Sequence, residues 1–186
     1  AFGLLEKLLH YAEIIKGYNP IEGMTSASQG YHNRGFLYYK LRRWNEAISD
    51  YQKALDSRRF IYEYMPHKEN KRVVGETLVN IGAAQLEWCK ENHIVEGHNP
   101  IDTAKEALSI YESLYNKDYP LSEVDINKAK QLIATSYYYI GSLAEKQLGL
   151  EMMEEIYAWL TEHGENSYIA SFLDNTVSIL KMENLI

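Results

Sequence analysis

Apolar residues recur every three or four positions along almost the whole chain, and the two-residue alternation typical of strands is absent. In residues 2–17, leucine, alanine and isoleucine side chains gather on one side of the predicted helix. Glycine, asparagine and proline residues interrupt the pattern and mark the predicted helix ends. The helices expected from this pattern cover about residues 2–17, 25–41, 44–65, 70–91, 101–116, 122–147, 150–162 and 166–183, with Gly149 as the break after the sixth.

Eight helices joined by short connections, with no strands, predict an all-α fold of stacked antiparallel hairpins. The chain has 186 residues, 46% of them hydrophobic, which is enough to bury a continuous core. We expect a single helical-repeat domain over residues 1–186. Its predicted parts are an N-terminal helix at 1–20, three repeats at 25–66, 70–117 and 121–163, and a C-terminal capping helix at 165–183.

The first predicted hairpin carries small and aromatic residues at fixed positions. Tyr31, Gly35 and Tyr38 lie on its first helix, and Ala47 and Tyr51 lie on its second. Small residues let two helices approach closely, and aromatic side chains fill the volume between them. The pattern resembles the tetratricopeptide repeat, in which an aromatic residue, Leu-Gly and Tyr are followed by Ala-x3-Phe. One departure is an arginine, at position 34, where the family usually has leucine.

Two weaker copies follow, around Gly82 and Gly141. The intervals from Gly35 to Gly82 and from Gly82 to Gly141 both exceed the family's repeat length of about 34 residues, so longer helices or inserted connections are expected. In this respect the chain resembles the elongated repeats of kinesin light chains and of bacterial peptide sensors. The second copy comprises Leu78-x2-Ile81-Gly82 with Ala107-x3-Tyr111, and the third comprises Tyr137-x2-Ile140-Gly141-x2-Ala144 with Tyr157, which follows its glycine at the same interval as Tyr51 follows Gly35.

The resemblance implies a right-handed superhelix, because one hairpin cannot bury its face alone and the copies must stack. It also implies a protein- or peptide-binding scaffold whose concave face is lined by the first helix of each hairpin. Asn33 and Asn80 each lie two residues before a glycine, and an amide can both donate to and accept from a peptide backbone. An ordinary helix–helix hydrogen bond is the alternative use of each. The candidate partner-binding residues are His32, Asn33, Phe36, Lys40, Asn80, Ala83, Glu87, Tyr138, Tyr139, Ser142 and Lys146.

Other functions stay open at this stage. Asn33 and Arg34 resemble the centre of the carboxylate clamp of chaperone-binding repeats, but Val79 and Ala83 occupy the places where further basic residues are expected. The chain could also be a ligand- or peptide-sensing regulatory domain cut from a larger signalling protein, or an oligomerisation module that makes a homo-oligomer. The chain begins with alanine and its first residues already show helical spacing, so we expect a fragment of a longer protein.

The net charge of −7 argues against a general nucleic-acid binder. Residues 1–93 carry 13 basic and 11 acidic side chains, whereas residues 94–186 carry 6 and 15. Basic residues cluster in the first half, where solvated hairpin edges are the ordinary interpretation and an acidic partner segment is the alternative. These clusters are Lys40, Arg42 and Arg43, then Arg58 and Arg59, then Lys68, Lys71 and Arg72.

No motif for catalysis or cofactor binding stands out. The chain lacks a phosphate-binding loop, a nucleophile elbow and a zinc-protease motif, so we expect no enzyme activity and no cofactor. Cys89, His93 and His98 fall short of the four closely spaced ligands of a structural zinc site, so no metal is expected. The single cysteine fits a reducing, cytoplasmic setting. No membrane insertion is expected either, because no apolar run approaches the length of roughly 18 residues that suggests a membrane span.

Overall fold

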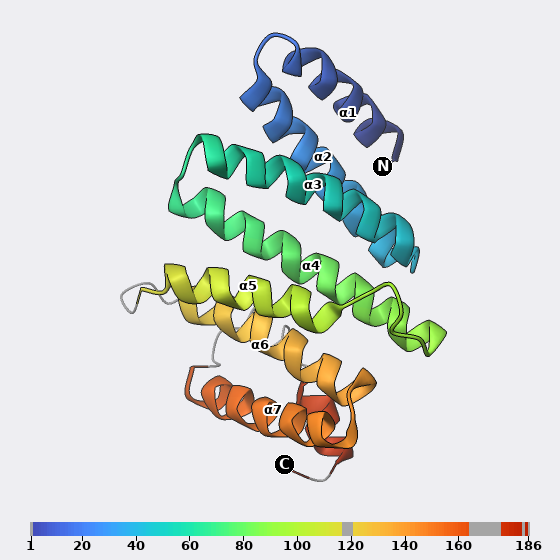
Figure 1. Cartoon of the computed structure of the whole chain (residues 1–186), viewed down its shortest axis with the longest axis vertical. Helices are drawn as coiled ribbons and strands as arrows, with labels where there is room; N and C mark the ends of the chain where they lie inside the picture. Colours follow the sequence, from blue (N-terminus) through green and yellow to red (C-terminus); the bar gives the residue numbers. More distant parts are fainter. Residues whose placement is uncertain (1, 117–120, 164–175, 184, 186) are drawn as a thin grey trace.

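The computed structural model describes residues 2–116, 121–163, 176–183 and 185. All regular secondary structure in this part of the chain is helical, which confirms the all-α prediction. The helices follow one another along the long axis of the molecule, from α1 at one end to α7 at the other (Figure 1). They are α1 (Phe2–Lys16), α2 (Pro20–Lys40), α3 (Trp44–Tyr64), α4 (Lys68–Asn92), α5 (Pro100–Leu114), α6 (Leu121–Ile140) and α7 (Leu143–His163), and residues 176–182 form a further helical segment.

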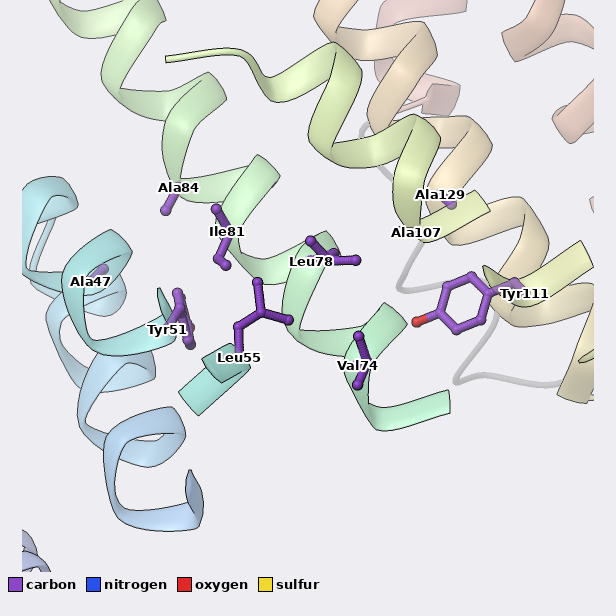
Figure 2. Close-up of a cluster of buried hydrophobic side chains, with 10 residues drawn as sticks. All are labelled: Ala47, Tyr51, Leu55, Val74, Leu78, Ile81, Ala84, Ala107, Tyr111 and Ala129. Atoms are coloured by element: carbon purple, nitrogen blue, oxygen red, sulfur yellow. The ribbon is translucent and has the colours of Figure 1, made fainter. Parts of the chain in front are cut away.

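Each helix packs against the next one in the chain, and α4 also packs against α6. The main apolar cluster therefore spans several helices rather than one hairpin. Figure 2 shows the α3 side chains, including Tyr51, on one side of α4, and Tyr111 of α5 on the other. Such a stack buries each helix between its neighbours, as expected for repeats that cannot fold singly. The cluster comprises Ala47, Tyr51, Leu55, Val74, Leu78, Ile81, Ala84, Ala107, Tyr111 and Ala129.

Two helices begin with the same Asn-Pro pair. Asn19 precedes α2, and its side-chain oxygen accepts a hydrogen bond from the backbone N–H of Glu22 at 3.3 Å. Asn99 does the same for α5, accepting from the N–H of Asp102 at 3.0 Å. Asparagine is a favoured N-cap and proline a favoured first helical residue, so the pair starts a helix as well as ending the previous one. The expected α2 start at about residue 25 was therefore wrong by more than a turn.

The break between α6 and α7 lies at Gly141 and Ser142, so the predicted helix 122–147 and the predicted break at Gly149 were wrong. Ser142 caps α7: the carboxylate of Glu145 accepts from its backbone N–H at 2.8 Å, and its hydroxyl accepts from the N–H of Glu145 at 3.4 Å. This reciprocal pair is a capping box, which starts a helix. Gly149 lies inside α7 and is buried.

Of the predicted last helix, 166–183, residues 166–175 lie outside the described residues. Residues 176–182 are helical. Ile179 and Leu180 are fully buried in a cluster with Ala134, Leu150 and Met153 of α6 and α7. The segment therefore packs against the α6–α7 hairpin.

The glycines show which residues the helices bring together. A Cβ at position 35 would lie 2.9 Å from the ring of Tyr51, so Gly35 lets α2 and α3 approach as its motif predicts. In the next hairpin Gly75, not Gly82, approaches the ring of Tyr111 in this way, at 2.8 Å. Gly82 instead approaches Leu132 of α6. Because α4 and α5 run antiparallel, Tyr111 near the C-terminal end of α5 lies opposite Gly75 in the N-terminal part of α4, a helix of 25 residues.

Candidate functional site

One face of α2 and one face of α4 carry regularly spaced residues, most of which line one of two hollows. On α2 these residues recur at intervals of three or four, which places them on one side of the helix. The α4 residues follow the same spacing. The stripe on α2 is Thr25, Gln29, His32, Phe36 and Tyr39, and the stripe on α4 is Val73, Glu76, Asn80, Ala83 and Glu87.

The first hollow has a volume of about 560 Å³ and lies between α2, the C-terminal part of α3 and the first half of α4. Its lining is mixed in character, with apolar side chains from α3 and polar side chains from α2. A polar ligand therefore finds both hydrogen-bonding groups and apolar contact there. It is lined by Thr25, Ser28, Gln29, His32, Asn33, Arg58, Ile61, Met65, Asn70, Val73 and Glu76.

The second hollow, of about 200 Å³, continues along the same face of α4 and reaches α6. Tyr39 enters it from α2, and Ala83 and Glu87 enter it from α4. Asn80 belongs to neither lining, but its place in the α4 stripe puts it between the two hollows. We call the surface formed by the two stripes and the two hollows the α2–α4 face. The second hollow is lined by Tyr39, Val79, Ala83, Leu86, Glu87, Lys128, Gln131, Leu132 and Thr135.

His32 and Arg58 are the titratable groups with shifted pKa values in the first hollow. Burial, and next the nearby Arg58 guanidinium, lower the pKa of His32, because both disfavour the imidazolium form. Its Nδ1 is buried and has no hydrogen-bond partner among the described residues, and its ring packs edge-on against Tyr51 at 5.6 Å. Burial also lowers the pKa of Arg58, whereas Glu76 raises it. The arginine remains charged at any physiological pH.

The structure brings most predicted residues of α2 and α4 to the α2–α4 face. His32 and Asn33 line the first hollow, and Ala83 and Glu87 line the second. Phe36 is 48% exposed, and Lys40 places its ammonium 5.2 Å from the centre of the Phe36 ring. The Phe36 ring thus lies at the surface between the two hollows, where it is available to a partner.

The predicted residues of α6 and α7 lie further along the molecule. The Tyr139 ring lies under Lys90 of α4 at 4.4 Å, which joins it to the end of the α4 stripe. Tyr138 donates to Glu183, and this bond raises the pKa of Tyr138 to about 12. Lys146 pairs with the same carboxylate at 3.3 Å. Tyr138 and Lys146 thus hold the C-terminal segment, and Ser142 caps α7.

Many residues that line the two hollows were not predicted from the sequence, among them Tyr39, Arg58 and Asn70. For the basic clusters a solvated hairpin edge was the ordinary interpretation and an acidic partner segment the alternative, and Arg58 lies in the first hollow. The signal was present, because Arg58 continues the buried stripe of Ala54 and Leu55 at helical spacing. Asn70 was missed because the prediction was centred on Gly82, whereas Gly75 is the glycine that faces Tyr111 of the second hairpin. The part of α4 that lines the first hollow therefore lies nearer the N-terminus of this helix than expected.

Arg34, the departure from the repeat pattern, has a structural role. Its guanidinium donates twice to Asp50 of α3, at 2.6 and 2.9 Å, and Asp50 is only 2% exposed. The hydrogen bond with Asp50 raises the pKa of Arg34. Because both oxygens of Asp50 are engaged, this bidentate pair fixes Arg34 between the helices. Arg34 is thus not available as the centre of a carboxylate clamp.

Neither a metal-binding cluster nor a membrane-spanning helix is found within the described residues. In this part of the chain no three His, Cys, Asp or Glu residues come together in a way that could hold a metal ion. Cys89 is buried, and the ring of His98 packs against Trp88 at 4.4 Å. None of the helices in the described ranges is both long and apolar enough to cross a membrane.

Comparison with known proteins agrees with the architecture of the first hairpin. No curated protein and no solved structure matches the chain. Residues 28–58 match the family model described as tetratricopeptide repeat. These residues cover the larger parts of α2 and α3, including the Gly35–Tyr51 contact. Over this hairpin the chain is similar to tetratricopeptide-repeat proteins, in agreement with its helical stack.

Proposed function

We propose that this chain is a protein-interaction scaffold that binds an extended peptide segment along the α2–α4 face. Tetratricopeptide repeats are in general protein-interaction modules, and residues 28–58 match that family. The observation that carries the proposal is the pair of hollows along the facing stripes of α2 and α4. An extended segment can follow such a face and place side chains in both hollows.

The residues on this face suit a peptide ligand. Asn33 and Asn80 supply side-chain amides, which can donate to a backbone carbonyl and accept from a backbone N–H. Phe36 and Tyr39 supply aromatic surface, which gives large contact area with few rotatable bonds. Polar groups would thus align the backbone, and the hollows would select side chains.

A peptide library tests this proposal. Peptides are selected on the immobilised chain, and their dissociation constants are measured with the Asn33→Ala/Asn80→Ala variant. We expect binding to weaken about tenfold, because the variant removes two backbone hydrogen bonds of about 0.5–1.5 kcal/mol each. The melting temperature should stay nearly unchanged, since Asn33 is exposed and Asn80 is half-buried.

Asn45→Ala is the matched control, because Asn45 is an exposed asparagine on α3 outside both hollows. It should leave peptide binding unchanged. Equal binding by the double variant and the wild type would rule out the amide contacts. Selected peptides that perturb only residues outside the α2–α4 face in nuclear magnetic resonance spectra would contradict the proposed surface.

Self-association is a second candidate function, favoured by the outer surface of α1. Leu4, Tyr11 and Tyr18 recur at a heptad interval on one side of this helix region, and they are 75%, 61% and 89% exposed. An exposed stripe of large apolar side chains suits contact with another protein surface, for which a second copy of this chain is the candidate. Sedimentation should then show a dimer that Tyr11→Lys dissociates, and a monomer at all concentrations would contradict this candidate.

A further inference from the structure

The arginines of this chain differ in how their charge is neutralised. All of them lie in the described residues. Every arginine except Arg58 forms an ion pair with a carboxylate, whereas Arg58 forms none with any described carboxylate. Surface arginines commonly find such partners, so a half-buried arginine without one is the exception to explain. The pairs are Arg34–Asp50, Arg42–Glu91, Arg43–Glu46, Arg59–Glu106 and Arg72 with Glu69 and Asp125.

Arg58 is held in place by neutral groups. Its Nη1 donates to the backbone carbonyl of Val73 at 3.1 Å and to the hydroxyl of Thr77 at 2.6 Å. Within the described residues, Nε and Nη2 make no hydrogen bond. The guanidinium is therefore fixed on α4 by one nitrogen, and two nitrogens keep donors for another group. Arg58 also lines the first hollow, so that group can come from a ligand.

We propose that Arg58 forms a subsite of the first hollow for a carboxylate of the bound peptide, so that the preferred partner segment carries a glutamate or aspartate there. This inference rests on the proposed function. A guanidinium presents a planar fork of donors that matches a carboxylate, and burial strengthens the interaction relative to water. Asn33, on the same hollow, adds an amide donor.

The other charged groups of the hollow set the strength of this subsite. Glu76 lines the hollow from α4, and its charge opposes a second carboxylate. His32 faces Tyr51 and Arg58 of α3 and Glu76 of α4. It is neutral at pH 7, because burial and Arg58 disfavour its protonation. A bound carboxylate favours the imidazolium, so binding and protonation of His32 are linked.

The test uses two capped pentapeptides of alanine, one with a central glutamate and one with a central glutamine, and inorganic phosphate as a third probe. Binding is followed by the nuclear magnetic resonance signals of the Arg58 Nε–H and of the α2 and α4 amides. We expect the glutamate peptide to bind about tenfold more tightly than the glutamine peptide, as a charge-assisted hydrogen bond predicts. Phosphate should bind more weakly than the glutamate peptide, because it lacks the backbone contacts.

Variants separate the carboxylate subsite from general effects. Arg58→Gln should abolish the preference for glutamate, while Arg59→Gln, which loses only an exposed pair with Glu106, should keep it. Glu76→Gln should tighten binding of the glutamate peptide about threefold by removing a like charge. A gain in affinity cannot result from a misfolded protein, so this variant keeps the test valid if Arg58→Gln is unstable.

Equal binding of both peptides at the α2–α4 face would overturn the carboxylate subsite and leave the peptide groove intact. Phosphate binding as tight as that of the glutamate peptide would also overturn it, in favour of a free anion. Failure of both peptides to perturb this face would contradict the subsite together with the groove.

Discussion

The hairpins α2–α3 and α6–α7 each carry a glycine followed at the same interval by a tyrosine, but the two glycines have different environments. Gly35 lies inside α2, where a Cβ would come within 2.9 Å of the Tyr51 ring. Gly141 lies in the turn before α7, where a Cβ would meet Tyr137 in the last turn of α6 and Glu145 in the first turn of α7. In α6–α7 the close approach is made from the second helix, because a Cβ at Gly149 would lie 2.6 Å from the carbonyl oxygen of Ala134.

The difference shows that equal spacing of residue types does not guarantee equal packing. A glycine acts as a packing residue only when it lies within a helix that faces a neighbour. In α6–α7 the capping box at Ser142 and Glu145 starts a helix immediately after Gly141, which removes that glycine from the interface. The two helices of each hairpin therefore approach closely at a different glycine, which is Gly35 in α2–α3 and Gly149 in α6–α7.

The largest expected effect concerns the ion pair that accompanies Gly35 in α2–α3. Arg34→Leu should lower the free energy of unfolding by about 3 kcal/mol, because it leaves the buried Asp50 carboxylate without its bidentate partner. Lys53, at 3.4 Å from Asp50, compensates only in part. Urea unfolding measures the loss. Arg59→Leu, which removes a pair half-exposed on both sides, should change stability far less.

A double variant sharpens this first prediction. Arg34→Leu combined with Asp50→Leu removes both charges and should recover part of the lost stability, because no buried charge is left unpaired. A single Arg34→Leu variant as stable as the wild type would show that the pair does not hold α2 to α3.

The next effect compares the glycine that allows close approach in α6–α7, Gly149, with the one that does so in α2–α3, Gly35. Gly149→Ala should destabilise by about 2 kcal/mol, since its Cβ would press on the backbone carbonyl of Ala134, which cannot move without shifting α6. Gly35→Ala should cost about 1 kcal/mol, because the obstacle is the Tyr51 ring and alanine favours the helix. Thermal or urea unfolding gives both values.

Gly17→Ala provides the control, because its Cβ would meet only the carbonyl of Ile14, at 3.4 Å. It should stay close to the wild type. Equal stability of Gly149→Ala and Gly17→Ala would mean that α6 and α7 do not approach as closely as described.

The smallest effect concerns pH and lies at the edge of the α2–α3 hairpin. Burial lowers the pKa of His32 in the folded state, so the unfolded chain binds its proton more readily. Stability that is present above about pH 6.5 should therefore be lost as the pH falls below that value. His32→Phe keeps an aromatic ring against Tyr51 and should flatten this slope, because it removes the titrating group. Melting temperatures over this range measure it, and parallel curves for both proteins would contradict the assignment.

Much of the helical architecture was predictable from the sequence, whereas the register of the later hairpins was not. The periodicity of apolar residues located the helices of the described part, apart from the boundary between α6 and α7, and the motif from Tyr31 to Tyr51 identified the first hairpin. The Asn19-Pro20 pair was visible but was interpreted as the end of one helix and not as the start of the next. The choice between Gly75 and Gly82 could not be made, because both lie at helical positions and only the position of Tyr111 on α5 distinguishes them.

The residues of the candidate site were likewise predictable from the sequence only in part. His32, Asn33, Ala83 and Glu87 were found from their spacing to the glycines, because residues on one helix keep a fixed angular relation. Arg58 and Asn70 were not, because they reach the first hollow from other helix turns. Whether an arginine is paired depends on carboxylates that come from other helices, as with Arg34 and Asp50.

The sequence by itself determined that this chain is helical, where most helices lie, and which hairpin follows the tetratricopeptide pattern. These properties are local, since periodicity, caps and small residues act over a few turns. Only the tertiary structure decided which glycine faces which tyrosine, where α6 ends and α7 begins, and which arginine forms no ion pair with a described carboxylate. Those properties depend on contacts between residues far apart in the chain, which only the packing of helix against helix brings together.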